Sequence, residues 1–404
     1  MALTVKQNNG ILIEYGGSGI VLDPTRNSQE YPAFVTHAHV DHASAFKHSD
    51  MIKYATGPTY RLLETLRWKN LDNWNLIKIG DSIKLDDIEV KVHNAGHVIG
   101  SVQFEIETPE GTILYTGDFA QGNSFTMKPA PPIHCDLLII ETTFGAPQFH
   151  FPKRKDLALE MVRWAIMEVI PCGLIPTFRT DALGNAQEII SAFNKLTNLP
   201  IVTVKNATKV SDIYKQYGYK LDYVDAASSE GEELLESGRC LLIAPKSTKL
   251  KYKNLTSALA SGWAIMMGNN RKAFPLSDHA DFYELLNFIR KCNPKRVLTF
   301  HSGKITKNFH NIIQKKLKIN AKPITSIEDT IHGSFIGQDI RVKACYNHIM
   351  RTLRIPGFEY TSPWLIKEMA KKGFTRGETE IALSYLLERN ILESTSSGVR
   401  LYSL

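Results

Sequence analysis

The chain has 404 residues, which is enough for two or three domains that each bury a hydrophobic core. Its composition, 43% hydrophobic and 22% charged, is that of an ordinary globular protein, and no stretch approaches the ~20 apolar residues of a membrane helix. The formal net charge of +7 favours anionic partners such as nucleic acid, and solvated helix faces explain it equally well. The basic excess lies late, with eight Lys or Arg against three acids in residues 303–343.

The first 150 residues are predicted to form short strands separated by turns, with few long helices between them. The predicted strands cover residues 10–15, 19–22, 33–36, 88–93, 101–107, 112–116 and 137–140. Several of these strands end directly on a His, Asp or Glu. Strand ends hold side chains rigidly while loops leave them open to substrate, so we expect the reactive residues at the strand ends.

From about residue 151 the predicted elements alternate between helix and strand, which is typical of a parallel sheet. They are helices over 156–170 and 186–196 and strands over 173–176, 201–204 and 240–244. Residues that can carry chemistry return at 275–281 and 296–303, so the middle block is predicted to be an insertion in the first domain. Beyond about residue 343, helices over 363–372 and 375–388 and strands over 391–393 and 399–402 give the outline of a winged helix.

The five cysteines are odd in number and far apart, without a C-x-x-C spacing, which argues against a disulfide framework or a zinc ribbon. We expect buried free thiols in a reducing compartment. The first ten residues lack the basic start and apolar run of a secretory signal, so a cytoplasmic protein is expected.

A run of metal-binding residue types, His37-Ala38-His39-Val40-Asp41-His42, follows the apolar strand at 33–36. Residues i and i+2 of extended chain point to one side, so His37 and His39 can share one ion, while Asp41 and His42 turn toward a neighbouring point. Ordinary surface or core histidines are the alternative, but the chain has only 13 His and three of them fall within these six residues. The run therefore predicts a metal-dependent hydrolase with room for two ions.

One loop cannot complete two coordination shells, so other strand ends must supply further ligands. His97 lies in Gly96-His97-Val98-Ile99-Gly100, where glycines let the backbone pack closely around an ion, and Asp118 follows the strand at 112–116. Taken alone, His97 is a turn histidine and Asp118 a turn former, but in this context they are predicted ligands, with Asp118 as a bridge. Two cations ~3.5 to 4 Å apart would lower the pKa of a shared water, and the bridging hydroxide would attack phosphorus.

These residues resemble the metallo-β-lactamase superfamily, and specifically its β-CASP nuclease branch, over roughly residues 1–340. Asp23, in Val21-Leu22-Asp23-Pro24, matches the family's Asp that supports the ligand loop. Three further motifs of the branch match Glu141 in Glu141-Thr142-Thr143-Phe144-Gly145, His279 in Ser277-Asp278-His279-Ala280-Asp281, and His301 in Thr299-Phe300-His301-Ser302-Gly303. The resemblance implies an α/β protein with a metallo-β-lactamase αββα sandwich over 1–150 and 275–342 and an inserted β-CASP α/β domain over 151–274. The winged-helix-like module over 343–404 has no support from the family.

The resemblance also implies two divalent ions, with Zn²⁺ expected before Mn²⁺. One ion would bind His37, His39, His97 and Asp118, and the other Asp41, His42, Asp118 and His301. Asp23 would hydrogen-bond a ligand His from behind and fix its tautomer. His279 would face the scissile phosphate, be oriented by Glu141 and protonate the leaving oxygen. Ser277 is expected to contact the substrate beside His279, and Asp41 to belong to the catalytic residues.

The inserted block departs from the family pattern at one position. Residues 175–178 and 182–188 resemble the family's strand, loop and helix, but Asn185 stands where Arg or Lys is usual. The change removes a positive charge from the start of the helix. A plain helix junction and a substrate contact are equal alternatives for this segment.

The substrate stays open between DNA and RNA, as do exonuclease or endonuclease action and polarity. His301 favours the RNA enzymes, such as ribonuclease J and mRNA 3′-end processing factors. In contrast, the sequence of residues 141–152 and 260–281 resembles the DNA-ligase-associated exonucleases. We expect a DNA exonuclease, with an RNA-processing nuclease as the alternative and a small-substrate metallohydrolase as a remoter one. A binding subunit without catalysis is disfavoured because every ligand position is filled.

The tail contributes little to this choice. From residue 343 onward it has nine basic and six acidic residues, so duplex binding, a homodimer and a contact with a repair or processing protein are all open. No spaced Tyr or Trp pattern of the kind that single-strand readers use is present. Strand preference is therefore expected to come from the shape of the groove.

Overall fold

The computed structural model describes residues 3–26, 30–68, 71–267, 272–324, 329–331, 340–353, 359–388, 391–395 and 398–401. It divides into a large unit, residues 4–329, and a small unit of residues 330–404 with the first three residues; the division falls within β20 (Asp329–Ile331). Part of the basic stretch 303–343, and the end of the predicted strand 399–402, lie outside the described residues.

Six of the seven strands of the first sheet follow one another in chain order. They are β1 (Leu3–Gln7), β2 (Ile11–Tyr15), β3 (Ser18–Leu22), β4 (Ala33–Phe34), β5 (Lys53–Thr56) and β6 (Trp74–Ile77). The turn from β2 to β3 consists of Gly16 and Gly17, both at positive φ, as a two-residue hairpin turn requires. From β3 to β6 the strands are parallel, and α1 (Gly57–Thr65) follows β5.

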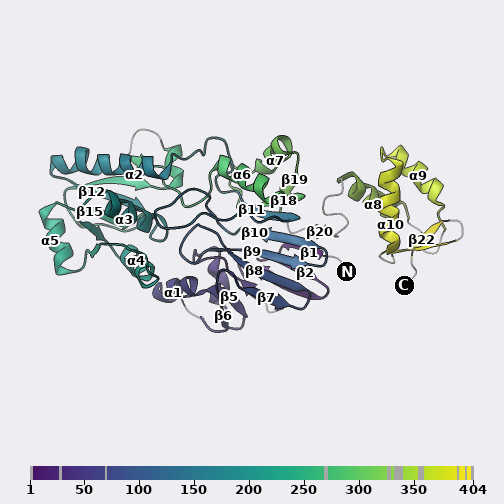
Figure 1. Ribbon diagram of the computed structural model, residues 1–404, viewed down its shortest axis with the longest axis horizontal. Coiled ribbons are helices and arrows are strands. Elements are labelled where there is room, and N and C mark those ends of the chain that lie inside the picture. Colours follow the sequence, from purple (N-terminus) through teal and green to yellow (C-terminus); the bar gives the residue numbers. More distant parts are fainter. Residues whose placement is uncertain are drawn as a thin grey trace. The chain divides into compact units, whose positions relative to one another are not determined.

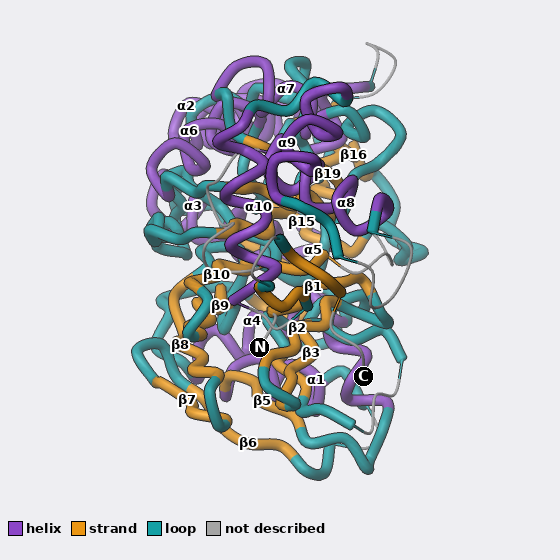
Figure 2. Tube along the Cα trace, turned by 90° about the vertical axis from the view of Figure 1, so that its right-hand side faces the viewer, coloured by secondary structure: helices purple, strands orange, loops and turns teal. Residues whose placement is uncertain are grey.

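The second sheet has the order β19-β18-β11-β10-β9-β8-β7. Its strands are β7 (Ser82–Leu85), β8 (Ile88–Asn94), β9 (Val102–Thr108), β10 (Gly111–Tyr115), β11 (Leu137–Glu141), β18 (Arg296–Phe300) and β19 (Asn320–Pro323). Phe34 of β4 packs edge-on against Phe104 of β9 at 5.4 Å between ring centroids, so the two sheets face each other. The outer face is covered by α6 (Phe282–Cys292) and α7 (Phe309–Leu317), which lie together in Figures 1 and 2.

Between β11 and β18 the chain forms a third, parallel sheet with the order β14-β13-β15-β12-β16-β17. Its strands are β12 (Ile175–Thr180), β13 (Ile201–Thr203), β14 (Val224–Asp225), β15 (Leu241–Pro245), β16 (Leu255–Ala260) and β17 (Ala273–Phe274), and its helices are α2 (Arg154–Arg163), α3 (Asn185–Leu196), α4 (Asn206–Gln216) and α5 (Ser229–Ser237). β12, β13 and β15 are almost entirely buried, as strands covered by helices on both faces must be.

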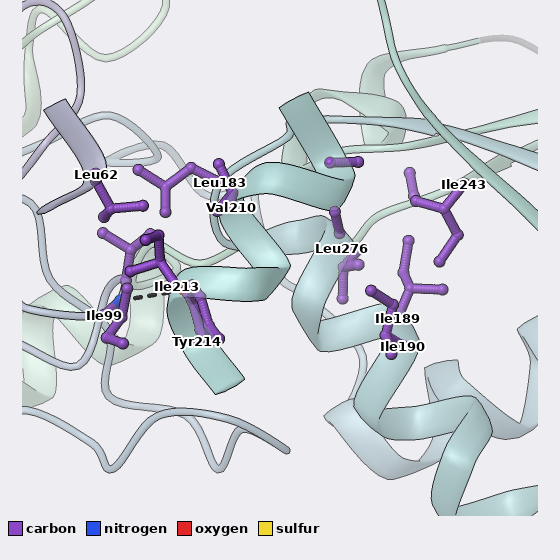
Figure 3. Close-up of a cluster of buried hydrophobic side chains, with 14 of the residues drawn as sticks. Leu62, Ile99, Leu183, Ile189, Ile190, Val210, Ile213, Tyr214, Ile243 and Leu276 are labelled. Atoms are coloured by element: carbon purple, nitrogen blue, oxygen red, sulfur yellow. Dashed lines mark hydrogen bonds between the residues drawn. The ribbon is translucent and has the colours of Figure 1, made fainter. Parts of the chain in front are cut away.

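The inserted elements share a hydrophobic core with the first part of the chain. Leu62 of α1 and Ile99 lie in the same buried cluster as Val210, Ile213 and Tyr214 of α4 (Figure 3). The Tyr214 hydroxyl accepts a hydrogen bond from the Ile99 backbone N–H at 3.1 Å. The loop that carries His97 is therefore anchored to the inserted block.

Two sequence predictions in this block need correction. The predicted strand 173–176 is β12, which begins two residues later and runs to Thr180, because Gly173 adopts a left-handed conformation that ends the preceding helix. The predicted helix 156–170 is α-helical only to Arg163 and continues as a π-helical segment, Trp164–Val169, before Pro171.

The small unit contains three helices followed by an antiparallel hairpin. These elements are α8 (Ile340–Thr352), α9 (Ser362–Lys371), α10 (Arg376–Glu388), β21 (Leu392–Ser394) and β22 (Val399–Leu401). Sequence analysis predicted the last four but not α8. Cys345 and Ile349 of α8 are fully buried in the core of this unit, together with Leu365 and Leu386.

No helix in the described part of the chain is long and apolar enough to cross a membrane. Four cysteines are buried as expected, but Cys172 is exposed, because it lies at the end of a helix on a surface turn.

Candidate metal centre

Four side chains from three strand ends of the large unit converge on one point. His37 and His39 follow β4, His97 follows β8, and Asp118 follows β10. His37 Nε2 and His97 Nε2 each lie 3.1 Å from His39 Nδ1, and Asp118 Oδ2 lies 3.6 Å from His37 Nε2 and 4.0 Å from His97 Nε2. Every ligand atom of this group is within 4.8 Å of the others, so one cation can contact all four.

A second group, Asp41, His42 and His301, adjoins the first. His42 Nε2 is 3.8 Å from Asp41 Oδ2, and His301 follows β18 with a positive φ of 54°. Asp118 lies between the groups, because its Oδ2 is 3.3 Å from His42 Nε2 and its Oδ1 is 3.4 Å from His301 Nδ1. A cavity of about 640 Å³ opens onto Asp41, His42 and His301, so this group is accessible from outside.

The chemistry of these atoms fits divalent cations. Within the described residues, His42 Nε2 and Asp118 Oδ1 are buried and have no hydrogen-bond partner. An unpaired buried polar atom costs about 1 to 3 kcal/mol, and a bound cation removes that cost. Imidazole nitrogens and carboxylate oxygens are ligands that Zn²⁺ and Mn²⁺ both accept.

Burial keeps His37 and His39 in the neutral form that binds metal. Burial and the neighbouring His97 lower the pKa of His39 to about 4, and burial holds the pKa of His37 well below its usual value. Burial would raise the pKa of Asp118, but His42 and His279 hold it well below its ordinary value. Neutral imidazoles and an ionised carboxylate are the protonation states in which these groups bind metal.

Asp23 supports the ligand loop from below. Its Oδ2 lies 2.6 Å from His42 Nδ1 and accepts hydrogen bonds from the Thr36 hydroxyl at 2.7 Å and the Tyr115 hydroxyl at 2.9 Å. Its Oδ1 accepts the Thr36 backbone N–H at 2.7 Å. The Thr36 hydroxyl also lies 2.9 Å from His37 Nδ1, so one carboxylate orients both histidines. Sequence analysis did not find Thr36 or Tyr115, which carry no motif.

A buried carboxylate and a half-buried imidazole form a pair beside the first ligand group. Glu141, at the end of β11, lies 2.9 Å from His279 Nδ1 through Oε1 and accepts the Thr143 backbone N–H at 3.0 Å through Oε2. Burial lowers the pKa of His279, but the Glu141 and Asp118 carboxylates raise it to about 10. The rings of His279 and His97 are 4.5 Å apart between centroids, so the pair borders the ligand groups.

The chain is similar to several known proteins. No protein-family model matches the chain. It is 30% identical over 280 residues to a "Probable DNA ligase" of Opitutus terrae, covering 67% of this chain and 26% of that one. It is 32% identical to an "RNase J-like protein" of Methanocaldococcus jannaschii (45% and 49% covered) and 26% identical to "RNase aCSPSF2" of Saccharolobus solfataricus (65% and 55% covered). The chain belongs to the β-CASP metallo-β-lactamase family.

The chain thus spans 26% to 55% of the length of these three relatives. A solved structure of a protein of unknown function from Enterococcus faecalis matches it with a TM-score of 0.60 and 15% identity, over 82% of this chain and all of the other. At that identity the match concerns the fold. The mixed α/β architecture with several sheets agrees with a metallo-β-lactamase β-CASP fold.

Two residues of the family's His279 motif hold the loop in place. Ser277, a predicted substrate contact, is buried, and its hydroxyl oxygen accepts the His279 backbone N–H at 3.0 Å. Asp278, which sequence analysis quoted in the motif but gave no role, accepts the His97 Nδ1–H through its backbone oxygen at 2.8 Å. Its carboxylate lies 3.9 Å from His97 Nδ1 and 3.8 Å from His279 Nε2, so Asp278 connects a ligand to the Glu141–His279 pair.

The block between β11 and β18 contacts this loop through Gly184. A Cβ built on Gly184, whose φ is +91°, would lie 2.2 Å from Asp278 Oδ2 and 2.9 Å from Val98 Cγ1. Only glycine permits this approach. The next residue, Asn185, begins α3 and is buried, so the departure from the family pattern lies within a helix junction.

Proposed function

We propose that this chain is a metal-dependent nuclease that hydrolyses phosphodiester bonds, and that its substrate is DNA, attacked from an end. The observation that carries the proposal is the position of Asp118 next to the Glu141–His279 pair. Its Oδ2 lies near His37 of the first group and His42 of the second, and its Oδ1 faces His301 of the second. A pair of adjoining cation sites beside a protonated imidazole suits a phosphodiester, which needs charge neutralised and a leaving oxygen protonated.

Two divalent cations, Zn²⁺ or Mn²⁺, would be held by the residues of the two groups. His37, His39, His97 and Asp118 would hold one, and Asp41, His42, Asp118 and His301 the other. Bound there, they would neutralise charge on the phosphate oxygens and make a water molecule acidic enough to supply the attacking group.

The protein's own residues supply the rest of the chemistry. Glu141 fixes the ring of His279 through Nδ1, which leaves Nε2 free to donate its proton to the leaving oxygen. Asp23 keeps His42 and, through Thr36, His37 in the tautomers that direct Nε2 toward the ligand group. Ser277 holds the backbone of His279 in place.

We also propose a division of the chain into three domains. Residues 1–150 with 275–342 would form the metallo-β-lactamase domain, residues 151–274 a β-CASP lid over the site, and residues 343–404 a winged-helix-like module for a homodimer or a repair or processing partner. The third sheet and the helix and hairpin order of the small unit support this assignment.

Two observations bear on DNA against RNA. Of the three relatives named above, the one named as a DNA ligase matches the largest share of this chain, 67%, which favours DNA. The RNase-named relatives and the presence of His301 favour an RNA-processing nuclease, which is the second candidate function.

The test gives purified protein 5′- and 3′-labelled single- and double-stranded DNA and RNA with Zn²⁺ or Mn²⁺. We expect stepwise shortening of DNA from one end, lost on chelation and in Asp41→Ala. His279→Ala should retain metal by mass or absorption analysis but lose at least about a hundredfold in rate, the size of a general-acid contribution. Cleavage of neither polymer by the metal-loaded protein would refute the nuclease assignment, and RNA shortened in preference to DNA would establish the second candidate.

A further inference from the structure

A second cavity, of about 740 Å³, is lined by His279 but by none of the predicted metal ligands. Ser277, His279 and Asp281 line it on one side, and residues 120–125 and 150–155 line it elsewhere. Arg154, at the start of α2, donates a hydrogen bond to the Ser277 backbone oxygen and pairs with Glu188 at 3.3 Å. The cavity wall is therefore tied directly to the loop that positions His279.

Aromatic rings from separate parts of the sequence gather in this cavity, although the sequence shows no spaced pattern. Tyr283 of α6 lines the cavity and has 55% of its surface exposed. The His150 ring meets it edge-on at 5.0 Å between centroids, and His150 Nδ1 lies 3.0 Å from Asp281 Oδ2. Phe151 adds a second, half-buried ring. Tyr283 therefore contacts His150 while more than half of its surface stays exposed.

The charges of the cavity wall favour an anion. Lys153 and Lys155 are exposed and, within the described residues, neither forms an ion pair. They lie at the N-terminal end of α2, where the helix dipole adds positive potential. The two acids of the wall both form hydrogen bonds within the protein. Asp281 accepts hydrogen bonds from the backbone N–H groups of Tyr283 at 2.8 Å and Glu284 at 2.9 Å. Glu284 accepts a hydrogen bond from the backbone N–H of Asp281 at 3.1 Å.

We propose that this cavity binds a single strand of nucleic acid next to the scissile phosphate, with a base stacked on Tyr283 and backbone phosphates on Lys153 and Lys155. A cavity of this volume holds a drug-sized ligand. A volume of this size matches a short piece of a single strand, so we expect a duplex to bind less well. Aromatic stacking combined with a basic groove is how proteins bind single strands without reading sequence. The inference rests on the proposed function for its orientation toward the reacting phosphate.

The test measures binding of the full chain by fluorescence anisotropy in EDTA, so that it does not depend on cleavage. The probes are a short labelled oligothymidylate, its ribonucleotide counterpart and a blunt duplex. We expect Tyr283→Ala to weaken single-strand binding about fivefold to a hundredfold, which corresponds to the loss of one base stack. Tyr283→Phe should bind as the wild type does, because it keeps the ring. The matched control is Tyr217→Ala, an exposed tyrosine outside the cavity, which should leave binding unchanged.

The lysines are tested by salt dependence. The double substitution Lys153→Ala with Lys155→Ala should reduce the slope of log Kd against log salt by about 1.4, the value for two phosphate contacts on a single strand. Lys315→Ala with Lys316→Ala, an exposed pair on α7, is the control and should keep the slope.

Three outcomes would overturn the inference: no single-strand binding by the wild type, tighter binding of the duplex, or equal effects in the cavity and control variants. A protein that cleaves nucleic acid while its Tyr283 and lysine variants bind unchanged would keep the proposed function and refute this inference. A protein that binds single strands through Tyr283 but cleaves nothing would do the reverse.

Discussion

Asp23 is the residue on which the hydrogen bonds beneath the ligand loop converge, and Asp23→Asn tests its role. The amide replaces one acceptor oxygen with a donor, so His42 and Thr36 lose a partner that fixes them. We expect metal affinity to fall about 10- to 100-fold, the usual cost of losing the partner behind a ligand histidine. Isothermal titration with Zn²⁺ measures it.

Asp86→Asn is the matched control for this substitution. Asp23 and Asp86 both have a positive φ, 44° and 51°, which Asn tolerates as well as Asp, so neither variant strains the backbone. Asp86 is exposed and bonds only Ser18 among the described contacts. Equal affinities of the two variants for Zn²⁺ would show that Asp23 does not tune the ligands.

The cysteines give a prediction that needs no substrate. Burial raises the pKa of Cys292 to about 12 and of Cys240 to about 11, and burial also raises the pKa of Cys135 and Cys345. The thiolate is the reactive form, so these four thiols stay protonated and inaccessible at pH 8. We expect iodoacetamide to label the native protein once, at Cys172, and the denatured protein five times. Rapid labelling of a second native thiol would contradict the burial.

At the scale of elements, the loop from β12 to α3 tests the contact between the inserted block and the site. In Gly184→Ala the new methyl group would displace the Asp278 carboxylate, and with it the backbone oxygen that orients His97. We expect cleavage to slow by about tenfold or more, together with a loss of about 1 to 3 kcal/mol of stability from strain.

Gly173→Ala separates this contact from backbone strain. Gly173 also has a positive φ, +72°, but a Cβ there would meet nothing within 4 Å. It should lose comparable stability in a denaturant titration while keeping its cleavage rate. If both variants cleave equally slowly, the contact between Gly184 and Asp278 has no part in the site.

A strand could be predicted from the sequence where apolar and polar side chains alternate clearly along it. β8 and β9 were predicted almost to the residue, because apolar and polar side chains alternate along them. β5 was missed because Lys53 occupies a fully buried position, where its Nζ donates to the Asp72 backbone oxygen at 2.7 Å. β6 and β7 were also missed, because each has only four residues and most of their side chains are not buried.

The candidate site could also be predicted only in part. The ligand types lie in short motifs at strand ends, so the sequence predicted which side chains the structure brings together, while their roles stay predictions. Partners such as Thr36 and Tyr115 could not be predicted, because a hydroxyl has no motif and Tyr115 lies 92 residues from Asp23 in the chain.

At the scale of the whole molecule, the two units have separate cores, and every predicted ligand lies in the large one. We expect scanning calorimetry to resolve two transitions. Zn²⁺ at about 100 times its Kd should stabilise the large unit by about 2.7 kcal/mol through mass action and leave the small unit's transition in place. EDTA should reverse the shift. A single transition that moves as a whole with Zn²⁺ would mean that the units unfold together.

The hydrogen bond from Ile99 to Tyr214 joins α4 to the backbone two residues from His97. If this bond transmits displacements, a shift of α4 would move the loop that carries His97, and a cation bound at His97 would restrain α4. Linkage requires such an effect to be reciprocal. If a nucleic-acid strand bound against the inserted block raises the affinity for a cation by some factor, the cation raises the affinity for that nucleic-acid strand by the same factor. The enzyme would then have its highest affinity for the metal when substrate is bound.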